Sequence, residues 1–303
     1  MNINLIAIQP VNGLTAAQFA AEPLDTLHYV TSVRALAEGR VRVTKINTEG
    51  SVNHLRIQNL SDQFAFFLDG DILVGAKQNR VLNTSLFLAP HTVTFVPVSC
   101  IEQGRWRFSQ AHFESAPCAA PPSLRALKSQ DLGARARASL NDHWANQGKV
   151  WHYVAHLAQM HDVQSPTGNL TDVFAAKQAT MDRALAALRH APGANGLALW
   201  AGDRLISVDI FNRADALGDY LPRLVRGALL DFVHQVTPPP PPSRAAATDR
   251  LATVICEALA HATPPRPSVG VGSERRFETA DTLGLALDYQ DQLVHLGLTA
   301  RAI

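Results

Sequence analysis

The chain of 303 residues is nearly neutral and moderately apolar, which already excludes several classes of protein. It contains 27 Lys plus Arg against 26 Asp plus Glu, and 47% of its residues are hydrophobic while 17% are charged. This balance permits a large core, argues against wholesale disorder, and gives no general reason to expect binding to nucleic acid or to a membrane surface. The length allows two or three domains, or one large one.

Cysteine usage and hydropathy indicate a soluble cytoplasmic protein. No apolar run approaches the ~18–20 residues that a membrane helix needs. Residues 1–10 carry no basic region ahead of their apolar stretch, so they do not resemble a signal peptide. Cys100, Cys118 and Cys256 are too few and too scattered for a disulfide framework. We therefore expect neither a membrane nor a nucleic-acid partner.

The first 110 residues are predicted to be rich in short strands. Residues 39–46 (GRVRVTKI) alternate polar and apolar side chains, as a half-buried strand does. Turn signals with Gly, Asn, Asp or Pro separate the predicted strands at residues 3–8, 39–46, 54–58, 64–68, 72–74, 81–88 and 92–98. Short strands at this spacing favour a β-sandwich or small barrel, and the pattern is similar to that of jelly-roll and cupin-like folds.

Helices and further strands follow, which favours an α+β fold over a doubly wound sheet. Helices are predicted at residues 124–130 (after Ser123 as N-cap), 142–160, 172–190, 215–236 and 245–260. Strands are predicted at 196–200, 205–211, 276–279, 282–289 and 292–298. We predict a β-rich unit of residues 1–116 and a helical and mixed α/β unit of residues 123–303, which can also pack as one domain. Five prolines at 238–242 form a predicted surface spacer.

Two polar clusters interrupt the apolar strands of the N-terminal half. The first, residues 75–80 (GAKQNR), is followed by Asn83 and Thr84, and the second is residues 99–106 (SCIEQGRW). Residues 81–98 between them are predicted to form a hairpin that turns at residues 89–91. Such a hairpin brings its two outer ends together, so we expect residues 77–80 to lie near residues 99–105.

The residue types in these clusters suit the binding of an anionic, hydrogen-bonding ligand. Guanidinium groups match carboxylate and phosphate, and amides can orient a base or a sugar. The predicted ligand-binding residues are Lys77, Gln78, Asn79, Arg80, Asn83, Ser99, Gln103, Arg105 and Trp106. Glu102 is the candidate general acid or base, and Cys100 the candidate nucleophile if a neighbouring cation lowers its pKa. The alternative is a charged surface hairpin with Glu102 paired to an arginine and a buried, inert Cys100.

GAKQNRVLNTS followed by PVSCIEQGRW resembles a prokaryotic family described as the ARG and rhodanese-phosphatase-superfamily-associated protein domain. ARG stands for ADP-ribosylglycohydrolase. Weaker matches occur at residues 149–151 (KVW) and 208–211 (VDIF), and Asp71 stands where the family carries a glutamate. The resemblance implies a role near ADP-ribose or NAD-derived nucleotides, with both polar clusters as the signature. We refer to residues 75–84 and 99–106 as the signature segments.

Other signals are weaker. His152 and His156 are spaced i, i+4, but no third ligand is evident, so no metal is predicted and no cofactor is specified. Residues 269–273 (VGVGS) are predicted to form a turn, Trp144, Trp151 and Met160 to be core residues, and the basic residues from Arg125 to Arg137 to be a solvated helix face. We expect an enzyme acting on an NAD- or ADP-ribose-derived nucleotide through a pocket formed by the signature segments. A non-catalytic ligand sensor and a protein-interaction module are the alternatives.

Overall fold

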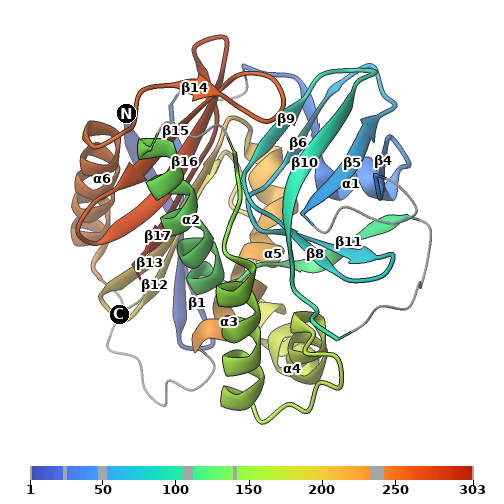
Figure 1. The fold of residues 1–303 in the computed structure, drawn as a ribbon. Helices are drawn as coiled ribbons and strands as arrows, with labels where there is room; N and C mark the ends of the chain where they lie inside the picture. Colours follow the sequence, from blue (N-terminus) through green and yellow to red (C-terminus); the bar gives the residue numbers. More distant parts are fainter. Residues whose placement is uncertain are drawn as a thin grey trace.

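The computed structural model describes residues 2–22, 26–46, 53–104, 112–138, 142–232 and 242–301. Within these residues the chain forms three β-sheets and six helices (Figure 1). The class is therefore α+β with a strand-rich N-terminal part, as predicted. None of the described helices combines the length and the apolar composition that crossing a bilayer requires.

The largest sheet joins strands from both ends of the sequence. The hairpin of β1 and β2 turns at Asn12 and Gly13, both with positive φ, and β2 then pairs with β12, which lies some 180 positions later. The spatial order is β1 (Ile3–Val11), β2 (Leu14–Ala21), β12 (Gly196–Ala201), β13 (Arg204–Phe211), β17 (Gln292–Ala300), β16 (Thr282–Tyr289), β15 (Ser273–Glu278) and β14 (Arg266–Pro267). Every pairing in this sheet is antiparallel.

Two smaller sheets curl around a shared apolar core. The six-stranded sheet has the order β11 (Phe113–Ala119), β7 (Asp71–Gly75), β8 (Arg80–Leu82), β10 (Val93–Cys100), β5 (His54–Asn59) and β4 (Val41–Thr44). The three-stranded sheet has the order β3 (Tyr29–Thr31), β6 (Phe64–Phe67) and β9 (Leu86–Leu88). Inward side chains of both, such as Ile57 and Phe67, belong to one buried cluster.

The helices cover both faces of the eight-stranded sheet. On one face, α6 (Arg244–Ala260) packs Leu251 and Ile255 into the cluster that contains Trp200. On the other face lie α2 (Pro122–Arg137) and α5 (Ala214–Phe232), with α3 (Gln147–Met160) and α4 (Leu170–Leu185) beside them at the lower end of the molecule in Figure 1. The short α1 (Ser32–Ala37) packs against the curled sheets.

The order of elements is predicted well, but some boundaries, four strands and the short helix α1 are not. The expected strand over residues 81–88 is wrong as one piece, because residues 83–85 leave β8 and the chain enters a different sheet as β9. The sequence pattern does not predict β2, β3, β11 or β14. The alanine-rich sequence of β2 (LTAAQFAA) has low strand propensity, and burial between two neighbouring strands overrides it. The jelly-roll or cupin likeness and the division into two units stay predictions.

Three local expectations are corrected. The helix over residues 142–160 begins only at Gln147, where Asn146 caps it, so residues 142–146 form an extended approach. Helix α2 starts at Pro122 with Pro121 as its N-cap, and Ser123 is inside the first turn. Trp144 and Met160 are each 40% exposed and are not core residues.

Candidate functional site

The predicted convergence of the signature segments is confirmed by the pairing of β8 with β10. In this antiparallel pair Arg80 lies opposite Cys100 and Val81 opposite Ser99. The turn before β8 places Ala76 in the left-handed region, with φ of +50°. The backbone N–H of Gly75 then donates to Asn79 Oδ1 over 3.1 Å, which closes the turn.

Glu102 is buried and its carboxylate joins three parts of the chain. Oε2 accepts a hydrogen bond from the backbone N–H of Asn79 at 3.1 Å, and Oε1 accepts one from Thr167 Oγ1 at 3.0 Å. Residue 102 also forms a β-bridge with Asn169, the N-cap residue of α4. The carboxylate therefore fastens both signature segments to the start of α4.

Cys100 is buried beside the amide of Gln78 and the guanidinium of Arg80. Its Sγ donates to Gln78 Oε1 at 3.5 Å, and Arg80 Nη1 donates to the same oxygen at 3.3 Å. Burial raises the pKa of the Cys100 thiol, and the nearby charge of Arg80 opposes that rise without reversing it. A thiol with a raised pKa is mostly protonated at neutral pH, which is the opposite of an activated nucleophile.

Most of the predicted ligand-binding groups are turned inward. Gln78, Asn79, Arg80, Asn83 and Ser99 are buried, Lys77 is half-buried and Gln103 is exposed. Arg105 and Trp106 lie outside the described residues. The partners of the buried groups are protein atoms: Gln78 Nε2, for example, donates to the carbonyl of Gln103 at 3.3 Å.

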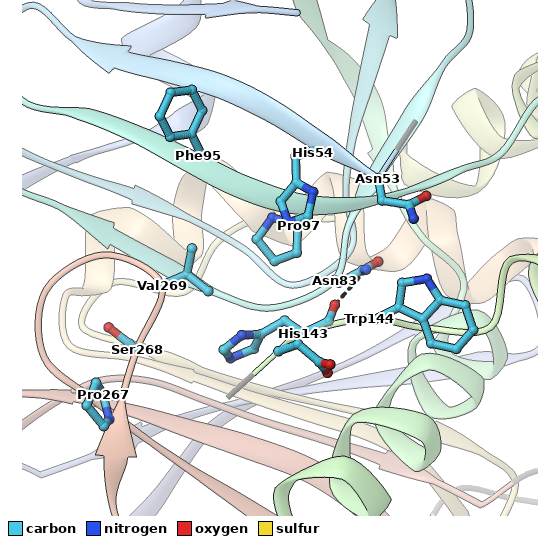
Figure 2. A pocket seen from close by; sticks show the side chains of 11 residues that line it. Asn53, His54, Asn83, Phe95, Pro97, His143, Trp144, Pro267, Ser268 and Val269 are labelled. Carbon is cyan, nitrogen blue, oxygen red and sulfur yellow. Dashed lines mark hydrogen bonds between the residues drawn. The ribbon is translucent and has the colours of Figure 1, made fainter. Parts of the chain in front are cut away.

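A cavity of about 430 Å³ opens beside these segments, between the six-stranded sheet, the approach to α3 and the loop after β14 (Figure 2). This volume lies within the range of small-molecule sites, ~300–1,000 Å³. Its walls are Asn53, His54, Asn83, Phe95, Pro97, Asp142, His143, Trp144, Pro267, Ser268 and Val269. Of the predicted ligand-binding residues that the structure describes, Asn83 is the one that lines this cavity.

Asn83 couples the cavity to the signature segments. Its Oδ1 accepts a hydrogen bond from Ser99 Oγ at 2.8 Å, and its Nδ2 donates to the carbonyl of His143 at 2.9 Å, the dashed line in Figure 2. The opposite wall depends on Gly270, where an added Cβ would lie 2.1 Å from the carbonyl oxygen of Phe87. The predicted turn at residues 269–273 is therefore present, and its close approach to β9 holds Val269 at the cavity.

Chemically, the cavity combines exposed aromatic rings with a fixed imidazole. Phe95 is 54% and Trp144 is 40% exposed although both are large apolar side chains. His143 is nearly buried, and its Nε2 lies 3.2 Å from Oε1 of the fully buried Glu274. Asp142 precedes it and pairs with Arg135, whose hydrogen bonds lower the pKa of the Asp142 carboxyl.

Comparison with family models shows where this chain belongs. The model of the ARG and Rhodanese-Phosphatase-superfamily-associated Protein domain, ARPP-1, matches residues 2–299. The chain is a member of the ARPP-1 family. No match was found among curated proteins or among solved structures. The name places the family in the company of ADP-ribose-related enzymes, and it assigns neither an activity nor a pocket.

A second polar cluster lies under the cavity of this ARPP-1 chain, where the weak match at residues 208–211 supplies Asp209. Arg125 makes two hydrogen bonds to Asp209, at 2.7 and 3.0 Å, and Lys128 Nζ lies 2.8 Å from Asp69 Oδ1. Both cations are buried, so the expectation of a solvated basic face is wrong for them. Opposite charges on β13 and on the turn before β7 make their burial possible.

Within this cluster Ser85, His295 and Asp209 follow one another as a hydrolase triad does. Ser85 Oγ lies 3.0 Å from His295 Nδ1, and His295 Nε2 lies 3.2 Å from Asp209 Oδ1. All three are buried, Asp209 is already paired with Arg125, and Ser85 Oγ accepts a hydrogen bond from the backbone N–H of Asp69. A substrate cannot reach this hydroxyl, so the trio holds the sheets of the ARPP-1 fold together.

The described part of the ARPP-1 chain contains no group of three or more His, Cys, Asp or Glu side chains arranged to hold a metal ion. His152 and His156 are exposed on α3. The sequence pattern predicts Trp144 as a core residue and does not single out His143 or Phe95 as site residues. The sequence signal for these residues is the run Asp142-His143-Trp144 just before the N-cap Asn146. Its spacing also fits an amphipathic helix, so only the non-helical backbone of residues 142–146 reveals that it precedes α3.

Proposed function

We propose that this ARPP-1 domain binds a ligand of the NAD or ADP-ribose class in the cavity lined by Phe95, Trp144 and Asn83. The observation that carries the proposal is the exposure of two large aromatic side chains on the wall of one cavity. Planar bases stack on such rings, and each stacked base contributes about 1–3 kcal/mol. The family's association with ADP-ribosylglycohydrolase-related proteins supports this choice of ligand class.

The polar wall groups suit a nucleoside. Asn53 and Asn83 offer amides that hydrogen-bond to base edges or ribose hydroxyls. Arg135 lies over the Trp144 ring, 5.3 Å from its centroid, and so occupies one face of the indole while leaving the other for a base. In this proposal the signature segments support the cavity through Asn83, and Glu102 and Cys100 stay candidates for a chemical role.

Titration followed by tryptophan fluorescence tests the proposal. Wild-type protein is titrated with NAD, ADP-ribose, adenosine and inorganic phosphate, and the same titrations are run on Trp144→Ala and Phe95→Ala. We expect NAD or ADP-ribose to bind, and each variant to weaken that binding about 5- to 100-fold, the effect of losing one stacking partner. Calorimetry replaces fluorescence for Trp144→Ala, whose reporter is removed.

Met160→Ala is the matched control, because Met160 is exposed to the same extent as Trp144 but lies outside the cavity wall. It should bind like the wild type. Equal affinity of all three variants, or no binding by the wild type to any nucleotide, would contradict the proposal and favour the protein-interaction alternative.

A further inference from the structure

Glu274 holds the imidazole of His143 in one orientation. Glu274 is fully buried on β15, where Arg276 Nε lies 2.8 Å from its Oε1 and Thr84 Oγ1 donates to its Oε2 at 2.5 Å. Burial alone would raise the pKa of this carboxyl, but the charge of Arg276 and the bond from His143 hold it well below its usual range. The Glu274 carboxylate therefore stays ionised, and Nε2 of His143 lies 3.2 Å from its Oε1.

A fixed anion at Nε2 determines which ring nitrogen faces the ligand. The neutral imidazole places its proton on Nε2 to donate to Glu274, which leaves Nδ1 as the basic nitrogen. Nδ1 has no hydrogen-bond partner among the described residues, and His143 lines the cavity. This is the arrangement of a general base with its orienting carboxylate.

The other titratable side chains that line the cavity are His54 and Asp142, and neither is an imidazole oriented by a buried carboxylate. His54 lies on the opposite wall, on β5, and is exposed, with no carboxylate bonded to its ring among the described residues. Asp142 is ionised through its pairing with Arg135 and lines the same cavity. The cavity thus contains one oriented base and one anion supplied by adjacent residues.

We infer that His143 is the catalytic base of a glycoside hydrolysis in this cavity, with Glu274 as its positioning residue. The inference rests on the proposed ligand class. A water molecule attacks ribose C1′, the new C1′–O bond forms as the bond from C1′ to the leaving base breaks, and the water's proton passes to His143 Nδ1. With NAD the base leaves as neutral nicotinamide and the product is ADP-ribose. The carboxylate of Asp142 stabilises the positive charge that develops on the ribose ring.

The experiment measures nicotinamide release from NAD by chromatography, together with the dissociation constant of NAD by calorimetry. We expect turnover by the wild type and a 10²–10⁴-fold loss of kcat in His143→Asn, with the dissociation constant changed less than threefold. Glu274→Gln keeps an oxygen for the imidazole N–H but loses the charge, so kcat should fall while NAD still binds. His156→Asn, on the exposed face of α3, is the control and should match the wild type.

Two outcomes separate this inference from the proposed function. NAD binding with no nicotinamide release, or a kcat of His143→Asn within threefold of wild type, would overturn the catalytic role while the binding proposal stands, and the domain would then be a sensor. Absence of NAD binding by the wild type would overturn the catalytic role, and absence of binding to NAD, ADP-ribose and adenosine alike would overturn both. If Glu274→Gln is too unstable to measure, His143→Asn still tests the inference, because His143 lines the cavity and Glu274 is fully buried.

Discussion

Asn83 donates a 2.9 Å hydrogen bond to the backbone carbonyl of His143, sixty positions later in the chain. Through this bond a residue of the first signature segment sets the position of a cavity wall that contains no signature residue. Ser99, from the second segment, donates to the same Asn83 side chain. The signature segments therefore support the cavity through Asn83. Substitution of signature residues that do not line the cavity should affect ligand binding at a distance.

Asn83→Ala tests this link. The change leaves the His143 carbonyl and the Ser99 hydroxyl buried without Asn83, so we expect the free energy of unfolding to fall by about 1–3 kcal/mol. The affinity for NAD should fall as well, because residues 142–144 lose their support. Urea denaturation and calorimetry measure the two effects. Asn53→Ala, a change at another cavity asparagine with no side-chain hydrogen bond to a described residue, should leave stability near wild type.

Glu102→Gln separates the structural role of Glu102 from a catalytic one. Both carboxylate oxygens accept hydrogen bonds, and the amide retains only one acceptor oxygen, so stability should fall by about 1–3 kcal/mol. Chemical denaturation and nicotinamide release are measured together. Loss of turnover with unchanged stability and binding would instead assign the chemistry to Glu102. Glu114→Gln, an exposed carboxylate on β11, serves for comparison.

The cysteines should differ sharply in reactivity. Cys256 is exposed, whereas burial raises the pKa of Cys100 and raises that of Cys118 to about 12. We expect iodoacetamide at pH 8 to add one label per native chain, at Cys256, as read by intact mass and peptide mapping. The Cys256→Ser variant should take up almost no iodoacetamide label. Rapid labelling of Cys100 in the native protein would instead support its predicted role as a nucleophile.

The buried His295 predicts an acid-sensitive fold. Burial lowers its pKa from the ordinary value of 6.5, although Asp209 opposes the shift. Since the folded pKa lies below the unfolded one, its stabilising contribution is complete above pH 6.5 and is lost as the pH falls below that value. His295→Gln should flatten the dependence of unfolding free energy on pH between 7 and 5, measured by urea denaturation. A parallel curve for the variant would contradict the assignment.

Asp209 affects the free energy of unfolding in a separate and lower range of pH. Burial raises the pKa of its carboxyl, but Arg125 and His295 more than offset that effect and lower it to about 2. The stability it contributes is present above its ordinary value of 3.8 and is lost as the pH falls toward 2. The Asp209 window lies below pH 3.8, so the comparison between pH 5 and 7 reports on His295.

The local features of this protein follow from its amino-acid sequence alone. Alternating residues indicate strands such as β4, and tight-turn residues indicate the hairpin of β12 and β13. The predicted hairpin over residues 81–98 places Arg80 near Cys100 correctly, but only residues 80–82 pair with residues 98–100, because β9 pairs with β6 instead. These features depend on neighbours a few residues apart, or on one hairpin, where periodicity and turn chemistry carry the information.

Which polar groups become buried and which line the cavity depends on the packing of distant segments. Gln78, Arg80 and Glu102 have residue types that suit a binding site, yet all three are buried. Arg80 and Cys100 of β10 both donate to Gln78, and Thr167, just before α4, donates to Glu102. Trp144 is a large apolar residue of the kind usually found in a core, yet it is exposed because residues 142–146 precede α3 and do not form part of the helix. Burial depends on contacts between segments that are distant in the sequence, such as Gln78 with Cys100 and Glu102 with Thr167. A local sequence pattern does not encode which side chains these contacts will cover.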